Sequence, residues 1–458
     1  MKYPVARVES RTSIQEAIRT VERSPFDRAF VVDPAGVYLG CVTIADLRRL
    51  LISGARGEEP VEAYPPRHVH KLTAELLEGR ELDERMMSGM ELEGVRYLPV
   101  VDAEGKIADV VSLEELERRY GLRPAAVGDG PGRRVLVVGG AGYLGSVLAR
   151  KLLSRGFRVR ILDSFIYGHR SLQPLAEDRG LEIVEGDLRH IPTMVATLAD
   201  VDAVVLLAAI VGDPASKVRP IETFETNVLA AQALASAARL QQVGRFLYAS
   251  TCSVYGVGSA LLDEEAPLNP VSLYARSKIE TEKIILGMGG EYFSPTILRM
   301  GTLYGLSPRM RFDLVVNTMS MKSFVDGRIQ VFGGGQWRPL LGVEDAAEVY
   351  ARCLEADLGK VGNQVFNVGS DAQNYRIEEV AGIISTALGG IPIHRDHSNL
   401  DARDYRVSFA KLSETLGFRP GQTIADAARA IVASLRSGDI RNPAQRIYYN
   451  HFFDSTEE

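Results

Sequence analysis

The chain has 458 residues, a formal net charge of −6 and a sequence pI near 5.8. This length predicts two or three domains, and the slight acidity gives no electrostatic reason to expect nucleic acid or an anionic membrane as a partner. There is no apolar run of about 18 residues and no signal-peptide pattern, which argues against a membrane-spanning or secreted protein. Three widely spaced cysteines, Cys41, Cys252 and Cys353, are typical of reduced thiols, so we expect a cytoplasmic protein.

Residues 1–122 contain the same pattern twice. In the first copy an apolar run at 29–32, a turn at 33–36 and a second apolar run at 38–42 lead to a helix that is expected to open at Thr43. Residues 97–116 repeat this order of strand, turn, strand and helix. The repeat predicts two supersecondary units packed together in an α+β domain.

These two copies resemble a tandem pair of cystathionine-β-synthase (CBS) motifs, a module that commonly binds adenine nucleotides. The resemblance implies that Asp46, three residues after Thr43, binds a ribose. The second copy has Glu115 at that position, which departs from the family's pattern. The residues alone leave another reading open, in which the two halves only pack together and the acid is solvated at a helix start.

A second domain is predicted over residues 134–458, after a Gly- and Pro-rich linker at 123–133. Apolar runs alternate there with helical stretches, and the runs lie at 135–138, 159–162, 181–184, 203–207, 246–249 and 296–298. Such alternation is typical of βαβ units, so we predict an α/β fold with a doubly wound parallel sheet of the Rossmann type.

A glycine motif follows the first of these runs directly. Gly139, Gly142 and Gly145 form GxxGxxG, and a helix is expected at 146–155. Small residues let the backbone approach a pyrophosphate at the positive N-terminus of a helix, so the motif predicts a dinucleotide site. Tyr143 and Leu144, inside the motif, are expected to belong to that site.

Asp163 ends the second predicted strand, 18 residues after Gly145. A carboxylate there accepts hydrogen bonds from the adenosine ribose and repels a 2′-phosphate, which favours NAD over NADP. The alternative is an Asp that caps a turn. Four nearby basic residues leave NADP open, namely Arg158, Arg160, His169 and Arg170. Further cofactor contacts are expected where the third and fourth strands end, at Asp187, Leu188, Leu207, Ala208 and Ala209.

Tyr274 and Lys278 are four residues apart and therefore share one face of a predicted helix. A tyrosine with a pKa near 10 is a poor base at neutral pH, and a nearby ammonium lowers that pKa. The pairing predicts an acid/base tyrosine, whereas the alternative is an ordinary surface pair. Residues 246–256 form a strand end that leads into a hydroxyl-rich loop, which can orient the reacting oxygen.

In this order, the glycine motif, Asp163 and YxxxK resemble the short-chain dehydrogenase/reductase family in its extended class, over about residues 133–450. The resemblance implies that Thr251 holds the family's Ser/Thr position and that Tyr274 is the acid/base with Lys278 as its partner. It also implies that Asn227 contributes to the cofactor site. Because extended members are often dimers, we expect a homodimer.

Residues 298–345 resemble nucleotide-sugar epimerases and their relatives through LRMGTLYG at 298–305, SPRMRFDLVVN at 307–317 and GGGQWRP at 333–339. The resemblance implies a substrate lobe formed mainly after residue 300, with Arg338 and Arg403 as ligands of the substrate diphosphate. For both arginines a surface charge is the alternative. The resemblance also implies substrate contacts from Thr302, Asp313 and Leu314.

The reaction that these residues favour is nucleotide-sugar 4-epimerisation, in which Tyr274 takes the O4 proton while NAD accepts the C4 hydride. Thr251 is followed by Cys252 and Ser253 instead of the Asp-Glu of dehydratases, which disfavours elimination of water. The alternatives are an NADP-dependent 4-keto-sugar reductase, a nucleotide-sugar dehydratase and, from another class, a non-catalytic nucleotide sensor. Gly342 stands where relatives have His, which leaves the sugar open. We expect no metal site, and an adenine nucleotide at Asp46 is expected to tune activity.

Overall fold

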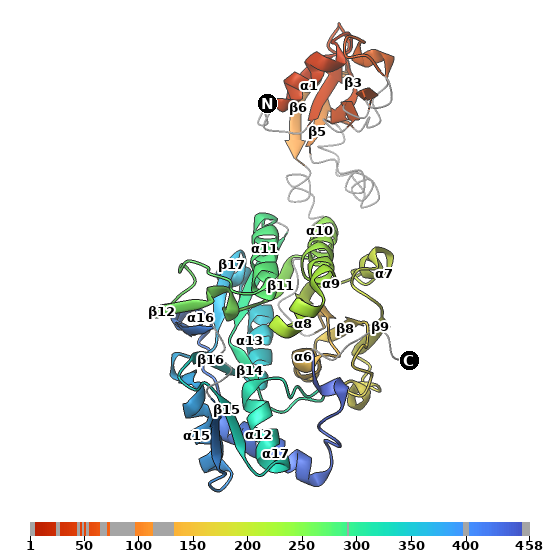
Figure 1. The fold of residues 1–458 in the computed structure, drawn as a ribbon. Helices are drawn as coiled ribbons and strands as arrows, with labels where there is room; N and C mark the ends of the chain where they lie inside the picture. Colours follow the sequence, from red (N-terminus) through yellow and green to blue (C-terminus); the bar gives the residue numbers. More distant parts are fainter. Residues whose placement is uncertain are drawn as a thin grey trace. The chain divides into compact units, whose positions relative to one another are not determined.

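The computed structural model describes residues 5–23, 28–43, 46–47, 50–51, 55–64, 71–73, 97–112, 132–290, 293–396 and 403–450. The chain divides into two compact units, Met1–Ala126 and Val127–Glu458 (Figure 1). Most of the predicted linker lies outside the described residues. Among the helices that the structure describes, none is both long and apolar enough to cross a bilayer.

The smaller unit contains two three-stranded sheets with the same arrangement. The first is formed by β1 (Ala6–Glu9), β2 (Arg28–Val32) and β3 (Tyr38–Thr43), and the second by β4 (Leu72–Thr73), β5 (Tyr97–Val101) and β6 (Ile107–Ser112). In each sheet the first pair of strands is parallel and the second pair is antiparallel. The predicted duplication is therefore confirmed for the described strands, and the helix predicted after Ser112 lies outside them.

The two copies pack into one core. Val37 and Lys106 hold equivalent positions just before the second hairpin strand, and they form an antiparallel bridge to each other. An apolar cluster joins Phe30 and Tyr38 of the first copy to Val110 of the second. Helix α1 (Ile14–Glu22), whose N-terminus is capped by the Ser13 side chain, packs through Ile14, Ala17 and Val21 in a second cluster. The second copy thus covers the face of the first sheet that carries Phe30 and Tyr38, as expected for paired repeats.

The larger unit is built on a seven-stranded parallel sheet with the strand order β17-β13-β11-β10-β7-β8-β9. Its strands are β7 (Arg134–Val138), β8 (Arg158–Asp163), β9 (Leu181–Glu185), β10 (Ala203–Leu206), β11 (Arg245–Thr251), β13 (Ser294–Met300) and β17 (Gln364–Val368). All six predicted apolar runs lie in these strands, which confirms the Rossmann-type sheet. The strand order reverses between β7 and β10, and open α/β sheets bind ligands at such a point.

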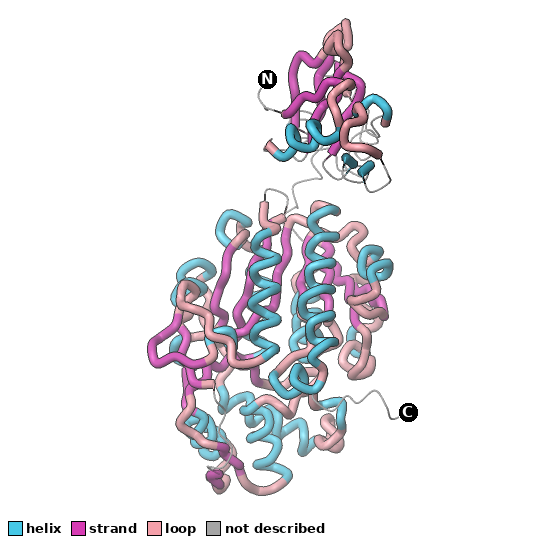
Figure 2. Tube along the Cα trace, turned by 45° about the horizontal axis from the view of Figure 1, so that its top comes forward, coloured by secondary structure: helices cyan, strands magenta, loops and turns pink. Residues whose placement is uncertain are grey.

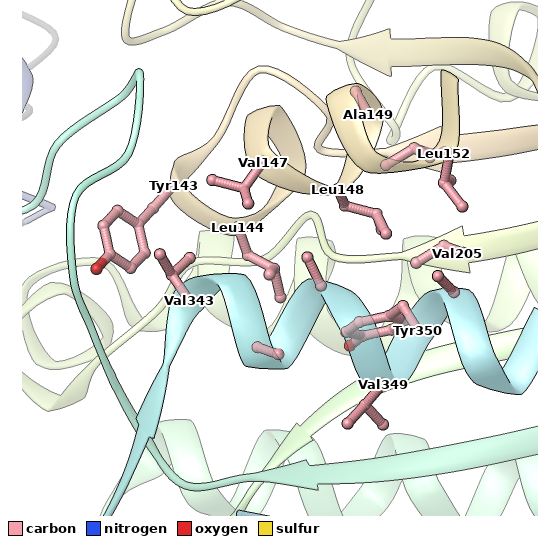
Figure 3. Close-up of a cluster of buried hydrophobic side chains, with 14 of the residues drawn as sticks. Tyr143, Leu144, Val147, Leu148, Ala149, Leu152, Val205, Val343, Val349 and Tyr350 are labelled. Atoms are coloured by element: carbon pink, nitrogen blue, oxygen red, sulfur yellow. The ribbon is translucent and has the colours of Figure 1, made fainter. Parts of the chain in front are cut away.

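Helices cover both faces of this sheet (Figure 2). Helices α6 (Tyr143–Ser154) and α13 (Val343–Glu355) bury one apolar cluster with alternate residues of β7, and Figure 3 shows Val147 of α6 and Tyr350 of α13 in it. Helices α10 (Ala231–Leu240) and α11 (Leu273–Gly287) pack in the cluster on the other face. Strands buried on both faces explain the nearly continuous apolar runs of the sequence.

A smaller lobe adjoins the carboxyl ends of the strands. It contains β14 (Thr302–Tyr304), β16 (Trp337–Gly342), β18 (Asn374–Arg376) and the paired strands β15 (Ile329–Phe332) and β19 (Ile393–Asp396). Its core also includes α12 (Val315–Val325), α15 (Ile377–Ala387) and α17 (Ile424–Ser437). The chain after residue 300 is not confined to this lobe, because α13 and β17 return to the main sheet.

Candidate functional site

A pocket of about 390 Å³ opens at the carboxyl ends of β7, β8, β10 and β11 and extends to the lobe. It brings together most of the predicted site residues. The predicted cofactor residues that line it are Gly139, Gly142, Tyr143, Leu144, Gly145, Asp163, Asp187, Leu188, Leu207, Ala208, Ala209, Tyr274 and Lys278. The predicted catalytic and substrate residues that line it are Thr251, Thr302, Leu314 and Arg403.

The glycine motif forms a turn that admits no side chain. A Cβ at Gly139, whose φ is +89°, would lie 2.6 Å from the backbone nitrogen of Ala208, and a Cβ at Gly145 would lie 2.2 Å from the carbonyl oxygen of Gly139. Helix α6 begins at Tyr143 instead of the predicted residue 146, because Gly145 lets its first turn lie directly against the loop. The N-cap residue Gly142 has no side chain to satisfy the first N–H groups, which suits an anionic ligand.

Asp163 lies at the end of β8 and lines the pocket. Its Oδ2 accepts a hydrogen bond of 2.9 Å from Ala141 N, and its Oδ1 accepts one of 2.8 Å from Phe165 N. Burial raises the pKa of this carboxyl, and the two backbone bonds oppose that effect. The Asp163 carboxylate therefore holds the glycine loop in place through Ala141 N. Asp163 caps a turn and also lines the pocket, so the two interpretations are compatible.

The four basic residues that left NADP open do not line the pocket. Arg160 donates to the carbonyls of Thr197 and Ala199 and pairs with Glu182 at 2.8 Å. His169 contacts Glu185 at 3.1 Å, Arg170 donates to the Asp439 carbonyl, and Arg158 is exposed on β8. At the far end of the pocket, Asp187 is paired with Arg189 at 2.7 Å, which lowers the pKa of the Asp187 carboxyl.

Thr251, Tyr274 and Lys278 converge on the pocket from two elements. Thr251 ends β11, and its Oγ1 accepts a hydrogen bond from Ser253 N at 3.1 Å. Tyr274 and Lys278 lie on the first two turns of α11, which the Ser272 side chain caps by accepting from Ala275 N. The cap fixes where the helix starts, and thereby which face carries the Tyr and Lys side chains.

The protonation of this pair differs from the expectation. Burial raises the pKa of Tyr274 to about 12, opposed chiefly by the charge of Arg311 and by a hydrogen bond with Thr251. Burial lowers the pKa of Lys278 to about 7. The Lys278 Nζ donates to the Ala249 carbonyl at 2.8 Å and lies 5.9 Å from the centre of the Tyr274 ring. Burial therefore outweighs the effect of the Lys278 ammonium, which was predicted to lower the pKa of Tyr274.

A buried ion pair lies behind these residues and was missed by the sequence analysis. Glu282, one turn after Lys278 on α11, accepts hydrogen bonds from Arg299 Nε and from Nη2 at 2.8 Å. Glu282 also accepts a hydrogen bond from the hydroxyl of Ser250, the neighbour of Thr251. The i, i+4 spacing from Lys278 is a signal that places Glu282 on the same face, but nothing local identifies Arg299 of β13 as its partner.

Asn227 does not line the pocket. Its Oδ1 accepts from Ile210 N at 2.8 Å, while its Nδ2 donates to the Ile210 carbonyl and to Ser277 Oγ. The structure places it between the loop after β10 and the helix of Tyr274. It lies in a π-helical turn, Glu225–Ala230, which directs its side chain inwards.

Two predicted substrate residues also lie behind the pocket wall. Arg338 is 4% exposed, and its Nη1 donates to the carbonyl oxygens of Trp337 at 2.6 Å and Arg403 at 2.5 Å. Asp313 forms a two-point ion pair with Arg311, which does line the pocket. The position where relatives carry His, Gly342, faces Gln422, since a Cβ there would lie 2.2 Å from Gln422 Oε1.

Several lining residues lay outside the sequence prediction. Arg219, Glu222, Arg309, Arg311 and Asn450 contribute polar groups to the pocket. Arg309 and Asn450 are far apart in the chain, and only the path of the C-terminal segment brings them together. Cys252 is buried and donates to the Arg299 carbonyl at 3.2 Å. Among the described residues, no three His, Cys, Asp or Glu side chains cluster as metal ligands do.

In the smaller unit, Asp46 and Leu47 are helical, in agreement with the helix predicted to open at Thr43. Its Oδ2 accepts from the Thr43 hydroxyl at 2.7 Å and from Thr43 N at 3.1 Å, while Thr43 Oγ1 accepts from Asp46 N at 3.1 Å. This reciprocal arrangement is a capping box, which satisfies two backbone N–H groups at the helix start.

Comparison with known proteins finds a matching family model in each of the two units. The model of the NAD dependent epimerase/dehydratase family matches residues 135–369, and the CBS domain model matches residues 1–53. UDP-glucose 4-epimerase of Corynebacterium glutamicum is 28% identical over 338 residues, covering 68% of this chain and 99% of the relative. A dTDP-glucose 4,6-dehydratase of Streptomyces niveus is 28% identical over 315 residues, covering 64% and 90%.

Among solved structures, DesIV, a dTDP-glucose 4,6-dehydratase from Streptomyces venezuelae with NAD bound, superposes with a TM-score of 0.61. It is 27% identical to this chain and covers 68% of it, with 100% of DesIV covered. The fold, the glycine loop and the Thr251, Tyr274 and Lys278 constellation agree with the family match, which spans half of the chain. The protein therefore belongs to the NAD-dependent epimerase/dehydratase family and carries a CBS domain at its N-terminal end.

Proposed function

We propose that this protein is an NAD-dependent nucleotide-sugar 4-epimerase that works through a transient 4-keto sugar. The observation that carries the proposal is the convergence of Thr251, Tyr274 and Lys278 on the pocket that also contains the glycine loop and Asp163. A dinucleotide suits this pocket because the glycine loop leaves no room for side chains where a diphosphate approaches the helix N-terminus. The UDP-glucose 4-epimerases among its relatives support the same reaction class.

NAD is favoured over NADP by the position of Asp163 and because none of the four nearby basic residues lines the pocket. A bound NAD would supply reversible hydride transfer at C4 of the sugar, which epimerisation requires. Asp163 is expected to accept hydrogen bonds from ribose hydroxyls with the lone pairs that its backbone bonds leave free.

The residues of the chain perform the proton transfers. Tyr274 takes the proton from O4 and gives it back after the 4-keto sugar has turned over in the pocket. Thr251, which lines the same pocket and helps to lower the pKa of Tyr274, holds O4 next to the phenol. Arg311 opposes the high pKa of Tyr274, so its positive charge favours the phenolate that proton removal requires. Arg403 and Leu314 belong to the substrate end of the pocket.

Elimination of water, the chemistry of the dehydratase relatives, is disfavoured. The two residues after Thr251 are Cys252 and Ser253, and Cys252 is buried in an apolar cluster with a raised pKa. The described carboxylates that line the pocket are Asp163, Asp187 and Glu222, none of which follows Thr251. Reduction of a 4-keto sugar by NADPH remains the alternative within this fold, and a nucleotide sensor is the alternative outside catalysis.

The test combines identification of bound small molecules with one substitution. Mass spectrometry of ligands released from the purified protein should detect NAD together with a UDP-, GDP- or dTDP-sugar, and that sugar should interconvert with its C4 epimer. Tyr274→Phe should reduce turnover by at least about 100-fold, the scale of general acid–base catalysis, while it retains NAD binding. Tyr375→Phe makes the same chemical change outside the pocket and should leave turnover unaltered.

Three outcomes would redirect the proposal. Consumption of NADPH without back reaction would identify a reductase. Release of water with formation of a 4-keto-6-deoxy sugar would identify a dehydratase. Wild-type cellular function in Tyr274→Phe would identify a sensor instead of an enzyme.

The N-terminal unit is proposed to bind an adenine nucleotide through Asp46 and so to tune activity, as the CBS match at residues 1–53 suggests. The capping box fixes the Asp46 carboxylate at the start of the helix, where the ribose is expected to bind. AMP and ATP should shift the melting temperature or the kinetics of the wild type, and Asp46→Asn should remove that shift. Identical melting and kinetics with and without adenylates would rule out this role.

The domain boundaries at 1–122, 123–133 and 134–458, the cytoplasmic location and the homodimer also remain proposals. Light scattering of the full chain tests the last of these, and a monomeric mass would reject it.

A further inference from the structure

Arg309 is a buried cation, and among the residues that the structure describes no carboxylate lies within 4 Å of it, although the charges of Asp313 and Asp163 act on it from further away. It lines the pocket, is 5% exposed and stacks on Tyr167, with its guanidinium carbon 3.6 Å from the ring centre. Its Nη2 donates to Asn450 Oδ1 at 2.8 Å, and its Nε has no hydrogen-bond partner within the part of the chain that the structure describes. Both contacts are with neutral groups, so neither compensates the charge.

The other arginines of the pocket differ in this respect. Each of the four has a carboxylate within 4 Å, and the closest contacts are 2.7 Å for Arg189 with Asp187 and for Arg311 with Asp313. Burial lowers the pKa of Arg309 to about 10, which reflects the unfavourable desolvation of its charge. A buried charge without a counter-ion is costly, so such a residue in a binding pocket calls for an anionic group from the ligand.

The segment that carries Arg309 is attached to the first turn of α6. The hydroxyl of Tyr143 donates to the Gly305 carbonyl at 2.7 Å, and Ser307 Oγ donates to the Tyr143 carbonyl at 2.7 Å. Ser307 also contacts Ser146 Oγ at 3.3 Å. Arg309 follows Ser307 by two residues. Its positive charge lowers the pKa of the Asp163 carboxyl and so opposes the effect of burial. The segment that precedes Arg309 is thus held against the first turn of α6, directly after the glycine loop.

We propose that Arg309 binds a phosphate oxygen of the cofactor diphosphate and that Asn450 is its positioning residue, so that the C-terminal segment helps to build the cofactor site. The inference rests on the dinucleotide site of the proposed function. It adds a cation from the lobe to the backbone N–H groups of the α6 N-terminus. The C-terminal segment is held close to the chain around Arg309 by a second contact, in which Phe312 N donates to the Tyr448 carbonyl at 2.9 Å.

Three variants separate charge from packing. Arg309→Gln removes the charge and should weaken NAD binding about tenfold or more, the scale of one charge-assisted hydrogen bond. Asn450→Asp supplies the missing counter-ion, so it should raise the melting temperature of the ligand-free protein and weaken NAD binding at the same time. Asn450→Ala loses only the positioning contact and should weaken NAD binding less than Arg309→Gln. Arg150→Gln, at an exposed position of α6, is the control for net charge.

The measurements are dissociation constants for NAD and for UDP by calorimetry, together with melting curves of the full chain. The expected result is weaker NAD binding in Arg309→Gln and Asn450→Asp with unchanged UDP binding. If Arg309→Gln weakened UDP binding and left NAD binding intact, the anion would be the substrate diphosphate and the inference would be overturned. Unchanged NAD binding in both variants would overturn it as well, although the proposed function would stand. Failure of the wild type to bind NAD would instead reject the proposed cofactor, and this inference with it.

Discussion

The ion pair of Glu282 with Arg299 connects the stability of the catalytic helix to the end of β11. Both side chains are almost fully buried, at 3% and 6% exposure, and the shortest contact is 2.8 Å. Glu282→Gln keeps the shape but leaves Arg299 without a counter-ion. Removing one partner of a buried pair costs about 3–5 kcal/mol. The unfolding entropy of a unit of this size corresponds to about 1.5 °C per kcal/mol, which predicts a melting temperature lower by about 4 °C or more.

Fluorescence of Trp337, the only tryptophan of the chain, reports unfolding of the larger unit alone. Glu280→Gln on the same helix is the matched control, because its pair with Lys283 is more than half exposed on both sides and such pairs contribute about 0–1 kcal/mol. The double variant Glu282→Leu, Arg299→Met should recover much of the loss, since apolar replacements of a buried pair are often neutral. A melting temperature of Glu282→Gln equal to that of Glu280→Gln would refute this reasoning.

Two further predictions concern the cofactor loop and the catalytic lysine. Gly145→Ala should abolish NAD binding and lower stability by at least about 1 kcal/mol, because the new Cβ would meet backbone atoms. The control is Gly287→Ala, where a Cβ meets open space, and it should be neutral or stabilising in the same melting and binding assays. Lys278 has a folded pKa near 7, below its ordinary value of 10.5, so the unfolded chain binds more protons between these pH values and the destabilisation by Lys278 diminishes as pH rises. The gain in melting temperature of Lys278→Met over the wild type should therefore shrink from pH 7 to pH 10, and a constant difference would contradict the lowered pKa.

The parts of the site that could be predicted from sequence depend on local signals. The glycine motif follows a buried strand directly, and YxxxK needs only the pitch of one helix to place Tyr274 and Lys278 on one face. Six of the seven strands of the sheet were predicted from apolar runs, which burial on both faces explains for the central strands, whereas β17 was not predicted. In the N-terminal unit, Asp33 and Asp102 begin the same kind of turn in the two copies, and this repeated local signal predicts the duplication.

The remaining residues depend on contacts between distant segments. Arg338 matches a diphosphate-binding motif, yet its guanidinium bonds to the backbone of Arg403 and lies behind the wall of the pocket. Asn450 reaches Arg309 because the C-terminal segment runs back along residues 309–312, and no periodicity encodes that path. The protonation of Tyr274 likewise depends on total burial, which the sequence around it does not reveal.

Two arginines of the pocket, Arg403 and Arg309, differ in how their positive charge is compensated, and the difference suits the proposed reaction. At the substrate end, Arg403 already lies 3.5 Å from Asp213, so an incoming diphosphate must compete with a carboxylate. At the glycine loop, Arg309 has no carboxylate partner among the described residues, so a diphosphate there gains the full interaction. The carboxylate beside Arg403 favours exchange of the sugar nucleotide, whereas the arrangement at Arg309 favours retention of the cofactor. An epimerase regenerates its NAD in every turnover and must exchange only the sugar, so on the proposed function this asymmetry lets the cofactor stay while substrate and product pass.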